Sequence, residues 1–214
     1  MSFVSVDALG AIARSPMERC ARAAQARFER RDGWNVAVSY PVAPAPTGWA
    51  DVSHLGKLEV HEHSLGLGTA TRSDGAWWCP LTERRALVLC QPARLGELKA
   101  RLGGSGFVDV TSVFAAITLV GPRAREVFAR FCALDLRDAV TPVGSFRPGS
   151  IARQPGMLLR EAEQRYLFLF GWAIGEYMWT VVEDAARHLG ARPIGVDALV
   201  PLEARAREEP RSDA

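Results

Sequence analysis

The stretch Phe107-Val-Asp-Val-Thr-Ser-Val-Phe-Ala-Ala-Ile-Thr-Leu-Val120, followed directly by Gly121-Pro122, decides the fold of this chain. Its many β-branched and aromatic residues favour a strand for much of its length. Gly121 ends that strand, and Pro122 suits the first turn of a helix, where no N–H is needed. Apolar side chains at positions 124, 127, 128, 131 and 132 then share one helical face. The sequence therefore predicts a strand that leads into an amphipathic helix.

Strands and helices also mix on both sides of this unit. Strands are predicted at 56–62, 86–91 and 166–170, with a hairpin between 150–153 and 157–160 whose turn centres on Pro155-Gly156. Helices are predicted at 15–28, 94–102 and 173–189, the last ending at Gly190, and 41–48 is predicted to be an extended loop. Antiparallel turns without a repeated strand-helix-strand cadence favour an α+β fold over a doubly wound parallel sheet.

The composition excludes several classes of protein. Of 214 residues, 48% are apolar and 23% are charged, which is typical of a globular domain. The formal charge is only +2, so no broad basic surface for nucleic acid is expected. No apolar run reaches the roughly 20 residues that cross a bilayer, and the N-terminus lacks a secretory signal pattern. We therefore expect a cytoplasmic protein without nucleic-acid or membrane partners.

The cysteines and the C-terminal residues indicate how the chain is organised. The four cysteines, at 20, 79, 90 and 132, have no C-x-x-C spacing and are predicted to be reduced thiols. Residues 204–214 are charged and lack apolar periodicity, which predicts a disordered tail. Residues 1–203 are accordingly predicted to form one domain.

Three other patterns favour structural interpretations over chemical ones. His61 and His63 flank Glu62 and could bind a metal together with His54, but no spacing supports a third ligand, so a solvated strand edge is favoured. No G-x-S-x-G elbow marks a hydrolase. The glycine-rich run 103–106 lacks the lysine and the following helix of a phosphate loop, and is predicted to be a turn.

Several short motifs occur in an order that matches a known family. They are Ser15-Pro-Met17, Asp32-Gly-Trp34, Asp51-Val-Ser-His-Leu-Gly56, Leu119-Val-Gly-Pro-Arg-Ala-Arg125 and Pro193-Ile-Gly195. Over about residues 12–200 the chain resembles glycine-cleavage T-proteins (aminomethyltransferases) and dimethylglycine or sarcosine dehydrogenases. The resemblance implies a tetrahydrofolate-binding domain of two interwoven α+β halves around a central hole. We expect no counterpart of that family's C-terminal barrel domain within these 214 residues.

The same resemblance implies a set of cofactor-binding residues. Asp51, Ser53 and His54 are candidates for polar contacts to the ligand, and Leu55 stands where the family has a methionine against the pterin ring. Asp74 is the single acid in a segment where the family has adjacent aspartates. No residue matches the catalytic aspartate, and Leu167 stands where a folate-contacting glutamate is expected. The residues themselves leave an alternative open, in which 51–56 is a capped turn that leads into a strand.

A short, barrel-less chain depleted of catalytic residues also resembles the gamma subunit of heterotetrameric sarcosine oxidase. That resemblance implies an accessory, non-catalytic subunit in folate-linked one-carbon metabolism, with flavin held by larger oxidoreductase partners. Trp77, Trp78, Trp172 and Trp179 are predicted interface anchors, with ordinary core filling as the alternative. A stand-alone, tetrahydrofolate-binding aminomethyltransferase-like protein is the second hypothesis, and a scaffold of unrelated function the third.

Overall fold

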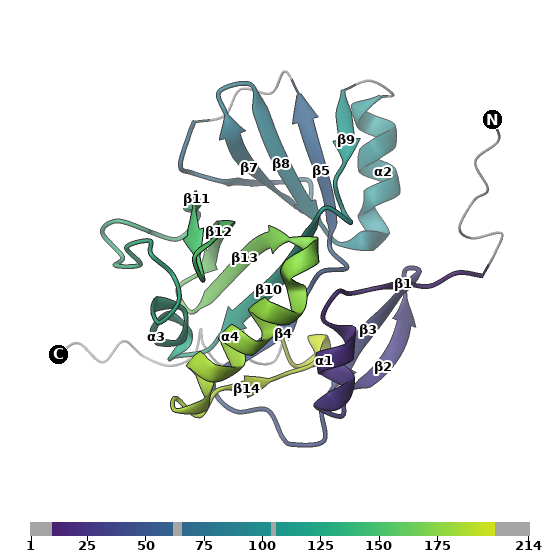
Figure 1. Ribbon diagram of the computed structural model, residues 1–214. Coiled ribbons are helices and arrows are strands. Elements are labelled where there is room, and N and C mark those ends of the chain that lie inside the picture. Colours follow the sequence, from purple (N-terminus) through teal and green to yellow (C-terminus); the bar gives the residue numbers. More distant parts are fainter. Residues whose placement is uncertain (1–9, 62–65, 104–105, 200–214) are drawn as a thin grey trace.

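The computed structural model describes residues 10–61, 66–103 and 106–199, and a six-stranded sheet forms its centre (Figure 1). The strands lie in the order β11 (Phe146–Ile151), β12 (Gln154–Ala162), β13 (Arg165–Gly171), β10 (Phe114–Val120), β4 (Gly48–Asp51) and β14 (Arg192–Pro193). Neighbouring strands run antiparallel, except that β14 lies parallel to β4. The strand predicted before Gly121 is therefore β10, in the middle of this sheet.

Three helices cover one face of the six-stranded sheet: α1 (Glu18–Ala23), α3 (Ala124–Ala129) and α4 (Gly175–Arg187). Figure 1 shows α4 lying across β10 and β4. Ala115, Ile117 and Leu119 of β10 pack on the helical side, whereas Ala116 and Val120 pack on the opposite side. Because side chains alternate along a strand, β10 is buried on both faces, which explains its nearly continuous apolar sequence.

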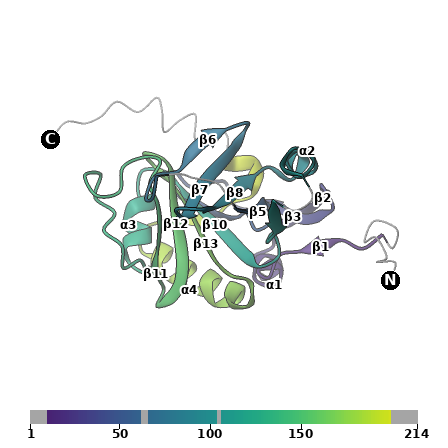
Figure 2. The same cartoon turned by 90° about the horizontal axis from the view of Figure 1, so that it is seen from above.

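A five-stranded sheet packs against the other face of the six-stranded sheet. Its strands lie in the order β6 (Thr71–Ser73), β7 (Ala76–Thr82), β8 (Arg85–Cys90), β5 (Gly56–His61) and β9 (Phe107–Asp109). The apolar layer between the two sheets includes Leu87, Leu89, Leu159 and Leu167. Helix α2 (Pro92–Leu102) covers the far side of the five-stranded sheet with the buried Leu98, as the view in Figure 2 allows the reader to follow.

The N-terminal part and the last described residues form a third unit. Strands β1 (Ala13–Arg14), β3 (Trp34–Ser39) and β2 (Arg27–Arg31) make a small sheet in that order, and a short 3-10 helix, η3 (Val196–Ala198), packs on β3. Gly195 lies so close to β3 that a Cβ there would stand 1.9 Å from the carbonyl oxygen of Val38. The segment after β14 thus locks onto the N-terminal sheet only because position 195 has no side chain.

Several predicted elements are confirmed. Strands β5, β8 and β13 match the predictions for 56–62, 86–91 and 166–170, and α2 begins two residues before the predicted 94. The helix predicted at 173–189 is a 3-10 turn, η2 (Trp172–Ile174), followed by α4, and Gly190 has the positive φ expected after a helix end. The predicted α+β class is therefore the observed one.

The predicted first helix is wrong in its C-terminal half. Helix α1 ends at Ala23, and Phe28 lies in β2, paired with Ala37 of β3. Gln25 has a positive φ of 61°, with its N–H donating to Arg22 O and the Ala26 N–H donating to Ala21 O. This pair of bonds is the Schellman motif that closes helices, here formed without glycine. The sequence carried no glycine signal for that stop.

Two further predictions need correction. The 150–160 hairpin exists, but its turn is formed by Ala152 and Arg153, both with positive φ, and not by Pro155-Gly156. Pro155 lies inside β12, one residue before the ladder with β13 begins at Gly156, so its missing N–H costs no bond to β13. The segment 107–120 is also split into β9 and β10 by a turn at 111–113.

The remaining structural findings concern termini, cysteines and helix length. The predicted tail 204–214 and His63 lie outside the described residues. All four cysteines are free, as predicted. Within the described ranges, no helix is long and apolar enough to cross a membrane.

We expect Gly195→Ala to lower the free energy of unfolding by about 3 kcal/mol, because the added methyl group would collide with the β3 backbone. Gly171→Ala is the matched control, since a Cβ at 171 meets nothing within 4 Å. Urea unfolding followed by circular dichroism measures both. Equal unfolding midpoints for the two variants would contradict the close packing of the 193–199 segment on β3.

Candidate functional site

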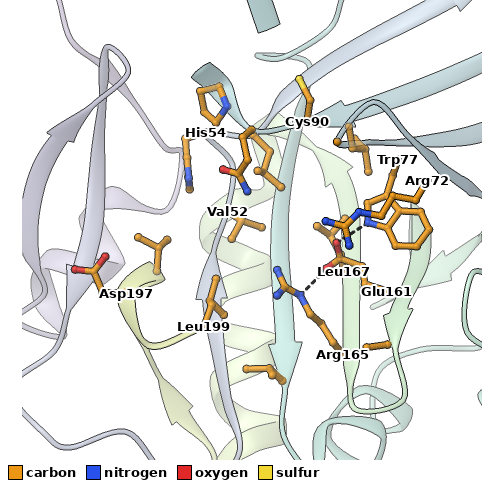
Figure 3. Close-up of a pocket in the computed structure, with 18 of the residues that line it drawn as sticks. Val52, His54, Arg72, Trp77, Cys90, Glu161, Arg165, Leu167, Asp197 and Leu199 are labelled. Carbon is orange, nitrogen blue, oxygen red and sulfur yellow. Dashed lines mark hydrogen bonds and ion pairs between the residues drawn. The ribbon is translucent and has the colours of Figure 1, made fainter. Parts of the chain in front are cut away.

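A cavity of about 1120 Å³ opens where the two large sheets and η3 meet. Four parts of the chain line it. The turn before β5 contributes Val52, His54 and Leu55, and the five-stranded sheet contributes Arg72, Trp77, Leu89 and Cys90. Strands β12 and β13 contribute Glu161, Arg165 and Leu167. Val196, Asp197 and Leu199 add a fourth side. Figure 3 shows His54 and Asp197 at one end and the group around Glu161 at the other, with apolar side chains between them.

The Asp51–Gly56 motif forms the turn between β4 and β5. The Ser53 N–H donates to Asp51 Oδ1 at 2.9 Å, and the Ser53 hydroxyl accepts the Ala116 N–H at 3.2 Å. Asp51 and Ser53 therefore serve the turn itself, as in the capped-turn interpretation, and neither lines the cavity. His54 and Leu55 do line it, so the turn presents two of the four predicted motif residues to the cavity.

Lys57, which the sequence analysis treated only as a strand residue, holds this turn from beneath. Its buried ammonium donates to Ser53 O and Leu55 O, each at 2.8 Å, and to Thr111 O at 3.3 Å. Three carbonyls match the three donors of an ammonium, a geometry that the flat guanidinium of arginine does not reproduce. The sequence does carry one signal for this residue, the rarity of lysine. Lys57 is one of only two lysines among 26 basic residues.

Burial shifts the pKa values of the titratable side chains at the His54 end of the cavity. Burial lowers the pKa of Lys57 to about 8, against the opposing effect of Asp51 and Asp109. It also lowers the pKa of His54 to about 4, helped by the positive charges of Lys57 and Arg31. Burial raises the pKa of Asp51, while hydrogen bonds from Ser15 and Ser53 oppose the rise. At neutral pH the cavity therefore meets a neutral imidazole at His54.

The other end of the cavity is built around Glu161, which the sequence analysis missed. Glu161 Oε1 accepts the indole N–H of Trp77 at 3.1 Å, and Oε2 accepts the Arg165 Nε–H at 2.7 Å (Figure 3). The guanidinium of Arg72 lies over the Trp77 ring, 5.7 Å from its centre. Trp77 and Glu161 are 84 residues apart, so no local pattern could join them. Leu167, whose expected counterpart is a glutamate, also lines the cavity and lies close to this group in Figure 3.

Asp74, the fifth predicted site residue, lies away from the cavity lining. It forms a tight hairpin turn with Gly75 between β6 and β7, with a positive φ of 54°. Its carboxylate accepts a hydrogen bond from Arg101 at 2.9 Å, and this ion pair lowers its pKa. Gly75 lines the cavity whereas Asp74 does not.

Two of the four predicted aromatic interface anchors, Trp78 and Trp179, are wrong, whereas Trp77 and Trp172 are partly exposed and stay predictions. Trp78 and Trp179 are buried, and Trp179 packs edge-on against Trp49 with ring centres 4.2 Å apart. Trp172 is half-buried against Trp34, and Trp77 belongs to the cavity wall. The favoured absence of a metal site at His61 stays a prediction, because His63 is not among the residues that can be described. Between 10 and 199, in the parts that are described, no group of three potential metal-binding side chains occurs.

We expect Lys57 to lose its proton near pH 8, because burial lowers its pKa from 10.5 to about 8. Between these two pH values the unfolded chain binds more protons than the folded chain, so this group makes folding more favourable as the pH rises, by about 3 kcal/mol in all. NMR of ¹³C-labelled lysine would show two Cε signals, one titrating near pH 8. Lys99→Arg assigns them, and a Lys57 signal that titrates at 10.5 would disprove the buried ammonium.

Acid should destabilise the protein through His54. Its pKa falls from 6.5 to about 4 on folding, so the unfolded chain binds more protons in that window and stability is lost as the pH drops through it. Between pH 6.5 and pH 4 the wild type should lose about 2 kcal/mol more than His54→Gln does, as measured by urea unfolding. His188→Gln, at an exposed position, is the control. An unchanged acid response in His54→Gln would show that His54 is not desolvated.

Comparisons with known proteins identify the fold. No protein-family model matches the chain, and no curated protein matches it. A chain of heterotetrameric sarcosine oxidase from Corynebacterium sp. U-96, solved with pyrrole 2-carboxylate, is similar with a TM-score of 0.64 and 20% identity over 82% of this chain and 95% of that one. The glycine cleavage system aminomethyltransferase T from Bartonella henselae is similar with a TM-score of 0.66 and 16% identity over 88% of this chain and 61% of that one.

These two likenesses confirm the fold that the sequence motifs predicted, at identities too low to carry an activity across. In this chain β4, from the first part of the sequence, pairs with β10 and β14 from the second part. Across the described residues the sheets stay open and form no barrel. This chain therefore has the α+β fold of the glycine-cleavage T-protein-like folate-binding domain.

Proposed function

We propose that this protein is an accessory, non-catalytic subunit of a sarcosine-oxidase-like complex that oxidises or demethylates amines in folate-linked one-carbon metabolism. One observation carries the proposal. The chain spans 95% of a chain of heterotetrameric sarcosine oxidase but only 61% of the aminomethyltransferase. The likeness thus extends over nearly the whole of a chain from a heterotetrameric oxidase.

The placement of the candidate acids supports a non-catalytic role. Asp51 is engaged by Ser53 within the β4–β5 turn, and Asp74 is engaged by Arg101 outside the cavity. Neither carboxylate lines the space where a ligand would lie. A general acid or base must reach the reacting atoms within hydrogen-bond distance, directly or through one water.

The expected partners are larger flavin-containing oxidoreductase subunits, which would hold the flavin. Contacts to them would come from exposed apolar side chains and not from the buried Trp78 and Trp179. Val42, Leu67, Val108 and Val113 are each more than half exposed. The complex is proposed to work in the cytoplasm, which suits four free thiols.

A second candidate function, a tetrahydrofolate-binding aminomethyltransferase-like protein, is favoured by the cavity. Its volume of about 1120 Å³ is ample for a cofactor of that size. Leu55 and Leu167 would contact the flat ring, and the neutral His54 would offer one donor and one acceptor. Tetrahydrofolate, when bound, would supply the nitrogen atoms that accept a one-carbon unit.

The accessory-subunit proposal predicts that the tagged chain, isolated gently from its native cells, brings larger chains with it. Mass spectrometry should identify them as oxidoreductase subunits, and the sample should have the absorbance of flavin. Purification from cells that carry the tag alone is the control. A colourless chain without companions would refute the proposal and favour the second candidate, which titration with tetrahydrofolate then tests.

A further inference from the structure

The hairpin between β11 and β12 turns on two residues that are poorly suited to its geometry. Ile151 pairs with Gln154, so Ala152 and Arg153 form a two-residue turn, and both have a positive φ, of 52° and 61°. Such a turn needs a left-handed backbone at both positions, and Asn-Gly is its usual sequence. A Cβ makes that conformation unfavourable. Arg153 therefore stands at the tip of this hairpin in a strained conformation, a feature that often marks functional sites.

An exposed tyrosine is fixed beside the same turn. Tyr177 of α4 is 46% exposed, and its hydroxyl donates a hydrogen bond to Ala152 O at 2.9 Å. The Ala152 N–H donates in turn to Phe131 O at 2.6 Å, two residues beyond α3. The hairpin tip, α4 and the end of α3 thus meet at one place on the surface. An aromatic ring that is already held there loses little conformational freedom when a partner covers it.

This part of the chain also carries an excess of positive charge. Residues 123–160 include seven arginines and three acidic residues, whereas the formal charge of the whole chain is only +2. Each of the three carboxylates is engaged by an arginine of the same segment, in the pairs Arg123–Glu126, Arg137–Asp135 and Arg160–Asp138. The arginines at 130, 147 and 153 form no ion pair with any residue that the structure describes.

Two of these arginines lie at the hairpin tip. Arg130 and Arg153 are exposed, and their chain neighbours Phe131 and Ala152 are hydrogen-bonded to each other. We call Arg130, Arg153 and Tyr177 the hairpin corner. Figures 1 and 2 show α3, β11 and β12 on the side of the molecule away from the N-terminal sheet. A guanidinium can bind both oxygens of a carboxylate at once, so the surface complementary to this corner is acidic.

We propose that the hairpin corner is the interface through which this chain binds an acidic surface of a larger subunit, with Arg153 paired to a carboxylate and Tyr177 packed beside it. This inference rests on the accessory-subunit function proposed above. Arginine and tyrosine are among the residues that contribute most to binding at protein interfaces. The interface is separate from the cavity, because none of the three residues lines it.

Replacing Arg153 with glycine separates binding from folding. Glycine adopts a positive φ freely, so Arg153→Gly should raise the urea midpoint of the isolated chain. The larger subunits are recovered by dissociating the native assembly, and biolayer interferometry measures their dissociation constant for the added chain. That constant should rise about tenfold in Arg153→Gly. A raised midpoint with unchanged affinity, or a lowered midpoint, would overturn the proposal.

Charge reversal tests the acidic character of the partner. Arg153→Glu should raise the dissociation constant about 100-fold, and Tyr177→Ala about tenfold. Arg30→Glu is the matched control, because Arg30 is an exposed arginine of β2, on the other side of the molecule, and its reversal changes the net charge equally. It should bind as the wild type does. Equal weakening by Arg30→Glu and Arg153→Glu would overturn the assigned interface and leave the accessory function intact. A wild-type chain that binds no larger subunit would overturn both.

Discussion

The buried ammonium of Lys57 is the interaction on which the site depends. Its three carbonyl partners belong to the turn before β5 and to the segment between β9 and β10, so a single charge joins the two sheets at one end of the cavity. Backbone carbonyls supply the partial negative charge that a desolvated ammonium needs, and among the described residues no carboxylate forms an ion pair with it. The turn held in this way directs His54 and Leu55 into the cavity, while Asp51 and Ser53 are hydrogen-bonded to each other within the turn.

The opposite wall follows from the alternation of β12 and β13. Side chains on one face of these strands, such as Phe168 and Phe170, pack under the helices. Side chains on the other face form the apolar layer between the two sheets. One carboxylate in that layer, Glu161, would be costly unless it were paired, and Trp77 and Arg165 pair it. The cavity thus has a neutral imidazole at one end and an oriented carboxylate at the other.

Sequence reasoning succeeded where local patterns decide structure and failed where distant contacts do. The apolar stripe of 173–189 correctly predicted α4, and the alternation of 56–62 correctly predicted β5. Five motifs in the right order correctly predicted the fold. The alternation of the strand puts Lys57 on the same face as Glu59 and His61. The pattern therefore could not predict that Lys57 is buried, because it is the turn before the strand that covers it. The Glu161–Trp77 bond spans 84 residues and has no local signature. Trp78 and Trp179 were misplaced because size and amphipathic character do not tell a core position from a surface one.

We propose that this chain works as one component of a larger oxidoreductase assembly and contributes a cavity of about 1120 Å³ to it. Native mass spectrometry of the assembly released intact from its own cells tests this claim most directly. The account predicts one species that contains this chain together with larger subunits, and release of flavin and of those subunits when the assembly is dissociated. A species with the mass of this chain alone, or of copies of it only, would contradict the account.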